Sequence, residues 1–144
     1  MTFVTRIVFL LLFLFLISTS QSPQKMIVKI DEVREMTGQL MIFIYNTEDD
    51  FPTKRDRAFA SKKIPVSSAS MTVDFDGIPS GTYGIAVYHD ENMNDKMDRS
   101  WYGMPNEGYG ASNDARGTFG PPKFADAKFE FKSMQDTVKI VIHY

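Results

Sequence analysis

Short segments of alternating apolar and polar residues make up most of this chain after its first twenty residues. In the first of them, Met26, Val28 and Ile30 fall on one side and Lys29 and Asp31 on the other, the period of two that is typical of a half-buried β-strand. Turn-forming residues separate these segments, and no amphipathic stretch of helix length follows residue 20. The pattern predicts an all-β fold, a single antiparallel β-sandwich of about seven strands at residues 25–33, 39–45, 62–66, 71–75, 82–89, 127–131 and 137–144.

Two of these segments and one turn carry more specific information. Residues 39–45 (QLMIFIY) are almost continuously apolar, which predicts an inner strand covered on both faces. Residues 62–66 suit an edge strand because Pro65 has no N–H to donate to a neighbour. The short turn at residues 36–38 predicts that the first two strands form a hairpin.

The N-terminus differs from the rest of the chain. Arg6 precedes an uncharged apolar run of residues 7–17 (IVFLLLFLFLI), and small residues follow at 18–20. This pattern predicts a signal peptide at residues 1–20 and a mature domain at 21–144, in the periplasm or secreted, with no membrane span after cleavage. The run is short for a bilayer span, and the alternative is an uncleaved N-terminal anchor. The absence of cysteine excludes a lipoprotein anchor, disulfides and thiolate metal ligands.

Length and charge limit the number of domains and the classes of function that this chain can have. A chain of 144 residues is about the size of one domain with its own core. A net charge of −2 leaves no basic surface for nucleic acid, so we exclude that class. The positive charges at Lys54, Arg55 and Arg57 are interpreted as solvated surface, with a small cationic spot as the alternative.

An oxygen-rich loop follows the strand at residues 82–89. Asp90, Asn92, Asn94 and Asp98 occupy positions 1, 3, 5 and 9 of a calcium-type loop, and Lys96 would contribute its backbone carbonyl. We therefore predict a weak Ca²⁺ site. The alternative is that these residues only form Asx turns with their own backbone.

Two positions of this loop depart from the calcium pattern. Asp95 stands where glycine normally permits a left-handed turn, and Trp101 stands where a bidentate glutamate is usual. Glu107 is the candidate for the missing carboxylate, and Glu91 is the second choice. Without flanking helices the loop does not predict an EF-hand.

An aromatic segment at residues 101–122 is the second candidate site. Trp101, Tyr102, Tyr109 and Phe119 lie among glycines and prolines, a composition that can project rings from a loop. Trp101, Tyr102 and Tyr109 are the candidate ligand-binding residues, for a peptide or a glycan from an envelope or extracellular partner. The alternative is that the rings fold back and cap one end of the sandwich.

Four longer motifs resemble known families. The run FDGIPSGTYGIAVYHDEN is similar to the start of a central strand in transthyretin-like and carboxypeptidase-regulatory-like domains. In order, HDENMNDKMD, WYGMPNEGYGASND and FGPPKFADAKFEF resemble the exported bacterial family known as domain of unknown function 2141, over about residues 26–144. The resemblance implies a seven-stranded Ig-like or prealbumin-like sandwich outside the cytoplasm and implies no activity.

The sequence thus favours a non-catalytic binding or structural module of the cell envelope with a calcium-binding loop. The alternative is a hydrolase-like enzyme that uses His89 with Asp90 or Glu107. Ser112 lacks the sequence context of a nucleophile elbow, and His143 is too far from His89 in sequence to predict a zinc site.

Overall fold

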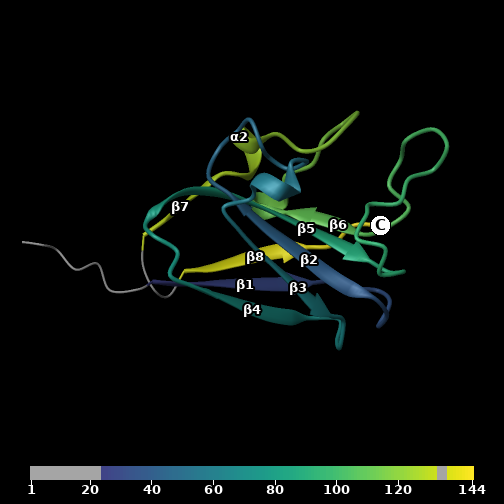
Figure 1. The fold of residues 1–144 in the computed structure, drawn as a ribbon, viewed down its shortest axis with the longest axis horizontal. Helices are drawn as coiled ribbons and strands as arrows, with labels where there is room; N and C mark the ends of the chain where they lie inside the picture. The colour runs from purple at the N-terminus through teal and green to yellow at the C-terminus, as the bar shows by residue number, and fades with distance from the viewer. Residues whose placement is uncertain (1–23, 133–135) are drawn as a thin grey trace, which may run out of the picture.

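The computed structural model describes residues 24–132 and 136–144, which form two β-sheets (Figure 1). The predicted signal peptide at residues 1–20 lies outside the described residues. Within the part that is described, the three helical segments are short: η1 (Arg55–Arg57), η2 (Ser112–Asp114) and α2 (Phe124–Ala127). The all-β prediction is therefore confirmed. No helix among the described residues has the length and apolar character needed to cross a bilayer.

The smaller sheet has three strands in the order β4-β1-β8, namely β4 (Met71–Asp76), β1 (Lys25–Asp31) and β8 (Thr137–Val141). β1 is central and runs antiparallel to β4 but parallel to β8. The prediction of a purely antiparallel arrangement is wrong for this pair. β8 follows β7 (Phe129–Phe131), which pairs with a strand of the other sheet, so no tight turn imposes an antiparallel direction on β8.

The larger sheet has the order β3-β2-β5-β6, with β7 also paired to β5. Its strands are β3 (Ala60–Pro65), β2 (Gln39–Tyr45), β5 (Gly81–Asp90) and β6 (Tyr109–Ala111). β3 lies at the edge and ends at Pro65, which confirms the edge-strand prediction. The Nζ atom of Lys62 on β3 donates to the carbonyl of Asp74 on β4, which links the two sheets at this edge.

The predicted hairpin of the first two strands is wrong. β1 and β2 lie in different sheets, and the turn at residues 36–38 carries the chain from one sheet to the other. Gly38 has a left-handed φ of 69°, and a Cβ placed there would lie 2.1 Å from the carbonyl oxygen of Asp90. The turn therefore packs its backbone directly against the end of β5, where the oxygen-rich loop begins.

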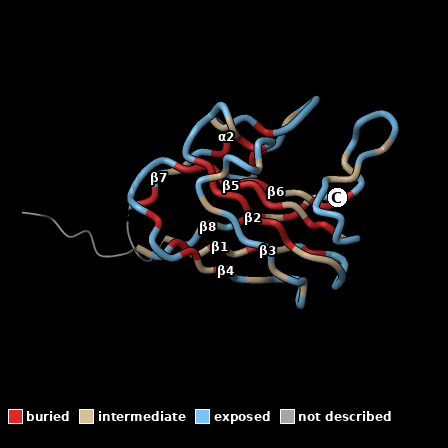
Figure 2. Tube along the Cα trace, viewed as in Figure 1, coloured by how far each residue is buried: buried red, intermediate tan, exposed pale blue. Residues whose placement is uncertain are grey.

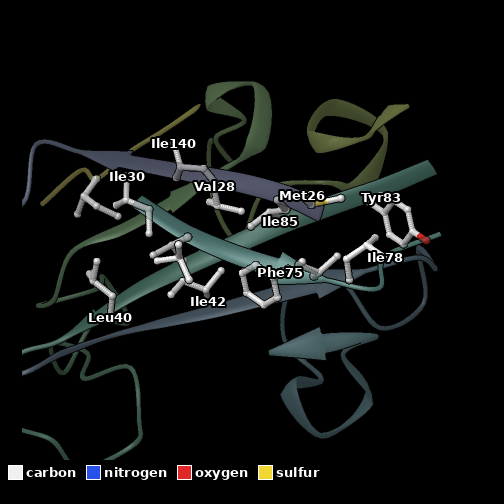
Figure 3. Packing of buried hydrophobic residues seen from close by; sticks show 14 of the residues in the cluster. Met26, Val28, Ile30, Leu40, Ile42, Phe75, Ile78, Tyr83, Ile85 and Ile140 are labelled. Atoms are coloured by element: carbon white, nitrogen blue, oxygen red, sulfur yellow. The ribbon is translucent and has the colours of Figure 1, made fainter. Parts of the chain in front are cut away.

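The main core fills the space between the two sheets (Figure 3). β2 contributes Leu40, Ile42 and Ile44 to this core and turns Met41, Phe43 and Tyr45 toward a second cluster on the outer face of the larger sheet. Both faces of β2 are buried, as predicted, and red segments mark this strand and β5 in Figure 2. The buried side chains of the main core are Met26, Val28, Ile30, Val33, Leu40, Ile42, Ile44, Val73, Phe75, Ile78, Tyr83, Ile85, Val87, Phe131, Ile140 and Ile142.

β6 was not predicted from the sequence. Its three residues pair with β5, and the backbones of Tyr109 and His143 exchange two hydrogen bonds of 2.9 and 2.8 Å. Gly110 lets β6 pack closely on β8, because a Cβ there would lie 2.4 Å from the carbonyl oxygen of Val141. β6 thereby connects the two sheets on the side opposite β3 and divides the aromatic segment into two shorter loops.

Candidate functional site

Asp90, at the end of β5, organises the loop that follows it. Its side chain is fully buried, and its Oδ2 accepts hydrogen bonds from Gln39 Nε2 at 2.8 Å and from the backbone N–H of Asp95 at 2.9 Å. Its Oδ1 accepts from the backbone N–H of Asn94 at 3.1 Å. A buried carboxylate requires such donors, and here it fixes the path of the loop back over β2.

Asp95 occupies the position that sequence reasoning expected to be left-handed, and its φ is 62°. Its carboxylate accepts from Lys63 Nζ at 2.6 Å and from Gln39 Nε2 at 2.9 Å. The hydrogen bond from Lys63 lowers the pKa of Asp95. Arg55 donates to its backbone carbonyl at 3.1 Å, so Asp95 ties the loop to β2, β3 and η1.

The remaining predicted metal ligands gather around Asp98. The side-chain amides of Asn92 and Asn94 donate to its carboxylate at 2.6 and 3.0 Å, and the backbone N–H of Lys96 donates to Asn94 Oδ1 at 2.8 Å. Asn92, Asn94 and Lys96 are exposed, and Asp98 is half-buried.

Glu107, nine residues after Asp98, lies against this loop. It is only 5% exposed, and its carboxylate accepts from the backbone N–H groups of Glu91 and Asp98 at 3.1 and 2.9 Å. The structure therefore brings Glu107 to the loop in which the sequence expected it to act. Among the described residues, no three acidic or histidine side chains meet in a metal-binding group, so a cation here would need the amide oxygens as well.

His89, the candidate acid or base, is fully buried beside this loop. Its Nε2 lies 2.8 Å from the carbonyl oxygen of Thr37, which can only accept, so Nε2 carries the proton. In the neutral ring Nδ1 then accepts from the Tyr144 hydroxyl at 2.6 Å. Ser112 is likewise buried, and its hydroxyl donates to Ala127 O at 2.6 Å and accepts from Ile85 N at 2.9 Å. Both side chains use their polar atoms to join strands and loops.

Tyr144→Phe is expected to reduce the free energy of unfolding by about 1–3 kcal/mol, because the buried Nδ1 of His89 would lose its donor. Urea unfolding followed by circular dichroism measures this effect. Tyr102→Phe is the matched control, because the Tyr102 side chain is exposed. This control should reduce the free energy of unfolding by no more than about 0.5 kcal/mol. Equal losses in the two variants would contradict the role assigned to the Tyr144 hydroxyl.

A second polar cluster involves His143, the other histidine. Its Nε2 lies 2.6 Å from Asp114 Oδ1, and Arg116 lies 2.9 Å from Asp114 Oδ2. The hydrogen bond with His143 lowers the pKa of Asp114, and Arg116 adds to this effect. The cluster joins η2 to His143, which lies two residues after β8 and forms a bridge with Tyr109 of β6.

We expect this cluster to make stability depend on pH. Because the folded pKa of Asp114 lies below its unfolded value, the ionised carboxylate stabilises the fold above about pH 4, and this contribution is lost as the pH falls through the folded pKa. The difference in Tm between the wild type and Asp114→Asn should therefore shrink as the pH is lowered from 7 to about 3. Thermal melts across this range measure it, and a difference independent of pH would contradict the assignment.

A groove of about 320 Å³ lies on the outer face of the larger sheet. Ala86 and Tyr88 of β5 and Tyr109 and Gly110 of β6 line it from the sheet. Tyr88 and Tyr109 are paired across the two strands, and Ala86 is small enough to leave space beside them. Loops on either side complete the groove with Met97, Arg99, Tyr102, Gly103, Met104, Pro105, Gly117, Thr118, Phe119, Gly120, Pro121 and Pro122, together with Pro52 and Thr53.

The rings of the two loops lie in water. Trp101 is 96% exposed, Tyr102 is largely exposed and Phe119 is fully exposed, whereas Tyr109 is half-buried in β6. These exposed rings contradict the alternative in which the aromatic segment folds back as a packed cap. In Figure 1 the loop after β5 extends beyond the end of β5 and β6, and the loop before α2 extends on the side of α2; both appear mostly pale blue in Figure 2.

Sequence reasoning missed several residues of the groove, above all Tyr88, Arg99 and Met104. A signal for Tyr88 was present: in the strand at residues 82–89 it falls on the face opposite Tyr83, Ile85 and Val87. An aromatic ring on that face indicates a second covered surface. The loop residues carry no periodic signal and could not be assigned in this way.

Neither the groove nor two more open hollows on the described surface is lined by His89, Asp90 or Glu107. The structure thus brings the predicted metal ligands together at the end of β5 and separates them from the rings. Met97, within the oxygen-rich loop, and Arg99, just after it, are the residues that connect the loop to the groove.

The match that comparison with known proteins gives is to a family profile. No curated protein and no solved structure gives a significant match to this chain. The sequence profile of domain of unknown function 2141, described as an uncharacterized protein conserved in bacteria, matches residues 28–139. This range includes the six strands from β2 to β7 whole, most of β1 and of β8, the oxygen-rich loop and the groove loops. The chain therefore belongs to the bacterial family of domain of unknown function 2141.

Proposed function

We propose that this protein is a non-catalytic binding module of the bacterial cell envelope, which holds a peptide or a glycan in the groove on its larger sheet. The observation that carries this proposal is the groove itself, with exposed rings on loops above a paired-tyrosine floor. Loops on a rigid sheet are a common place for binding residues, and large exposed apolar groups usually mark a contact surface.

The sequence supports a setting outside the cytoplasm for this module. The apolar run at residues 7–17 supports export to the periplasm or the medium through a signal peptide. Two sheets around one core support an Ig-like or prealbumin-like sandwich, with one pair of parallel strands as its departure from the usual antiparallel plan. In such a fold the loops at one end of the strands are free to bind partners.

We further propose that the loop at residues 90–98 binds Ca²⁺ through Asp90, Asn92, Asn94, the carbonyl of Lys96, Asp98 and Glu107. The left-handed φ of Asp95 and the approach of Glu107 support this proposal. Hydrogen bonds within the loop already occupy these oxygens in part, so calcium must displace the amide groups that donate to Asp98. We therefore expect weak binding, with a Kd of about 10⁻⁴–10⁻³ M.

Thermal melts in millimolar calcium test the ion site. At a concentration ten times the Kd, binding stabilises the folded state by about 1.4 kcal/mol, which corresponds to a rise in Tm of a few degrees. EDTA should reverse the rise, and Asp98→Asn should weaken it. If the Tm in millimolar calcium equals that in EDTA, the loop is only a hydrogen-bonded turn.

Methionine-methyl NMR tests the groove. Met97 and Met104 line it, whereas Met26 and Met41 are buried in the two apolar clusters. We expect titration with soluble oligosaccharides or peptide mixtures to shift the methyl signals of Met97 and Met104 and to leave those of Met26 and Met41 in place. Acrylamide should also quench the exposed Trp101, and a ligand long enough to extend from the groove over this ring should reduce that quenching. If no peptide or oligosaccharide shifts Met97 or Met104, the groove is not a binding site.

The hydrolase alternative receives less support from the geometry. A general base must reach a proton of its substrate, but the ring nitrogens of His89 contact Thr37 and Tyr144 and the ring is fully buried. Both oxygens of Glu107 accept backbone N–H groups. These contacts favour positioning of the loop over acid–base chemistry.

A further inference from the structure

Charge is distributed unevenly around the groove. Arg99 is the one charged side chain among the residues that line it, and its guanidinium donates to the carbonyl of Gly103 at 3.0 Å. Within the described part of the chain no carboxylate forms an ion pair with Arg99. A positive charge at the wall of an apolar groove is thus left for a ligand to neutralise.

A second guanidinium, that of Arg55, lies over Tyr88, which lines the groove. Arg55 stacks over the ring of Tyr88 at 4.5 Å and over that of Phe43 at 5.7 Å, and its donor contact is the carbonyl of Asp95. Among the described residues it forms no ion pair with a carboxylate, although its charge helps to lower the pKa of Asp95. Burial raises the pKa of the Tyr88 hydroxyl, and the charges of Arg55 and Arg99 both oppose that rise.

The rest of the surface has the composition of a protein interface. Trp101, Tyr102, Met104 and Phe119 are exposed, and no acidic residue or lysine lines the groove. Trp, Tyr, Met and Arg are enriched where proteins meet, and Trp, Tyr and Arg contribute most of the binding energy there. Trp101 lies outside the groove lining, so a ligand that only filled the groove would leave it in water, whereas an extended segment can continue over it.

We propose that the groove binds an extended acidic segment of a partner protein. An apolar side chain of that segment would pack against Tyr88, Tyr109 and Phe119, and an adjacent carboxylate would meet the guanidinium groups of Arg99 and Arg55. This inference rests on the proposed binding function and adds the chemistry of the ligand.

The test uses three fluorescein-labelled peptide mixtures that are identical except at one central position, which is Asp, Asn or Lys. The flanking positions are randomised among Phe, Tyr, Leu and Pro. Fluorescence anisotropy with the purified protein measures the affinity for each mixture. We expect the Asp mixture to bind about tenfold more tightly than the Asn mixture and the Lys mixture to bind most weakly.

Single substitutions identify the residues that produce the preference for the Asp mixture. Arg99→Gln should remove most of the preference for Asp over Asn, Arg55→Gln should reduce it, and Phe119→Ala should weaken binding of all three mixtures. Arg57→Gln is the matched control, since it removes the same charge from η1 at a residue that pairs with Asp50 and does not line the groove. Thermal melts of each variant serve to check that the fold is retained.

The outcomes separate this inference from the proposed function. Equal affinity for the Asp, Asn and Lys mixtures, all lost in Phe119→Ala, would overturn the acidic preference and leave the groove as a binding site. Binding of oligosaccharides with no binding of any peptide mixture would overturn the protein partner and still support the module. If no peptide mixture binds, this inference fails, and the methionine-methyl titration with oligosaccharides then decides the proposed function by itself.

Discussion

Gly38→Ala is expected to lower the free energy of unfolding by about 2–4 kcal/mol. The left-handed φ of 69° is unfavourable for alanine, and its Cβ would lie 2.1 Å from the carbonyl oxygen of Asp90 and 2.7 Å from the Cα of Glu91. Backbone atoms cannot move aside as a flexible side chain can. The substitution should therefore also displace the start of the oxygen-rich loop.

Gly77→Ala provides a matched control for this prediction. Gly77 has a similar φ of 75°, but a Cβ there meets nothing within 4 Å. Gly77→Ala should therefore lower the free energy of unfolding by only about 1 kcal/mol, the cost of placing alanine at a left-handed φ. Chemical denaturation measures both variants, and the NMR signals of residues 90–98 report the displacement. Equal losses in the two variants would show that the close approach of Gly38 to Asp90 does not matter.

Asp90→Ala is expected to destabilise the protein by about 3 kcal/mol even when calcium is absent. The fully buried carboxylate accepts three hydrogen bonds, and its removal leaves Gln39 Nε2 and the backbone N–H groups of Asn94 and Asp95 without this partner. Unfolding in EDTA measures this effect apart from any ion.

Asp98→Ala distinguishes a structural role from a metal-binding one. Asp98 is half-buried and accepts from the exposed amides of Asn92 and Asn94, so its loss in EDTA should be smaller, about 1 kcal/mol. In millimolar calcium both variants should lose the stabilisation that the wild type gains. If Asp90→Ala costs no more than Asp98→Ala in EDTA, Asp90 does not organise the loop.

Gly38→Ala and Asp90→Ala act at one place, the contact between the turn at residues 36–38 and the end of β5. Gly38, Gln39 and the carbonyl of Thr37 meet Asp90, Asp95 and His89 there. The loop that we propose to bind calcium is therefore held by β2 and its preceding turn, and through Met97 and Arg99 it forms part of the groove. Damage to this contact should weaken both proposed sites.

The sequence predicted the strand faces well because side-chain direction alternates locally. Met26, Val28 and Ile30 are fully buried on β1, and Ile140 and Ile142 are buried at the end of the chain, as their spacing indicated. The pattern that buries these residues does not specify a partner strand. The hairpin of β1 with β2 and the purely antiparallel plan were wrong for that reason, since both depend on which strands meet.

The candidate site was also predictable only where its residues lie close together in the sequence. The oxygen-rich loop could be recognised because its ligand types lie within nine consecutive residues, and Glu107 could be suggested because it is nearby in sequence. The groove could not be predicted, because Tyr88 and Tyr109 become neighbours only through the pairing of β5 with β6. β6 itself is three residues long and contains Gly110, which gives it too little pattern to be identified.

The sequence by itself determined that this chain forms short β-strands with defined inner faces and that a run of carboxylates and amides follows the strand that became β5. These properties depend on spacing along the chain, and neighbouring residues impose them. Tertiary structure alone decided that β1 runs beside β8, that Gln39 approaches the loop, and that Arg55 lies over Tyr88, a ring of the aromatic groove. Such contacts join residues far apart in sequence, and the packing of two sheets around one core fixes them.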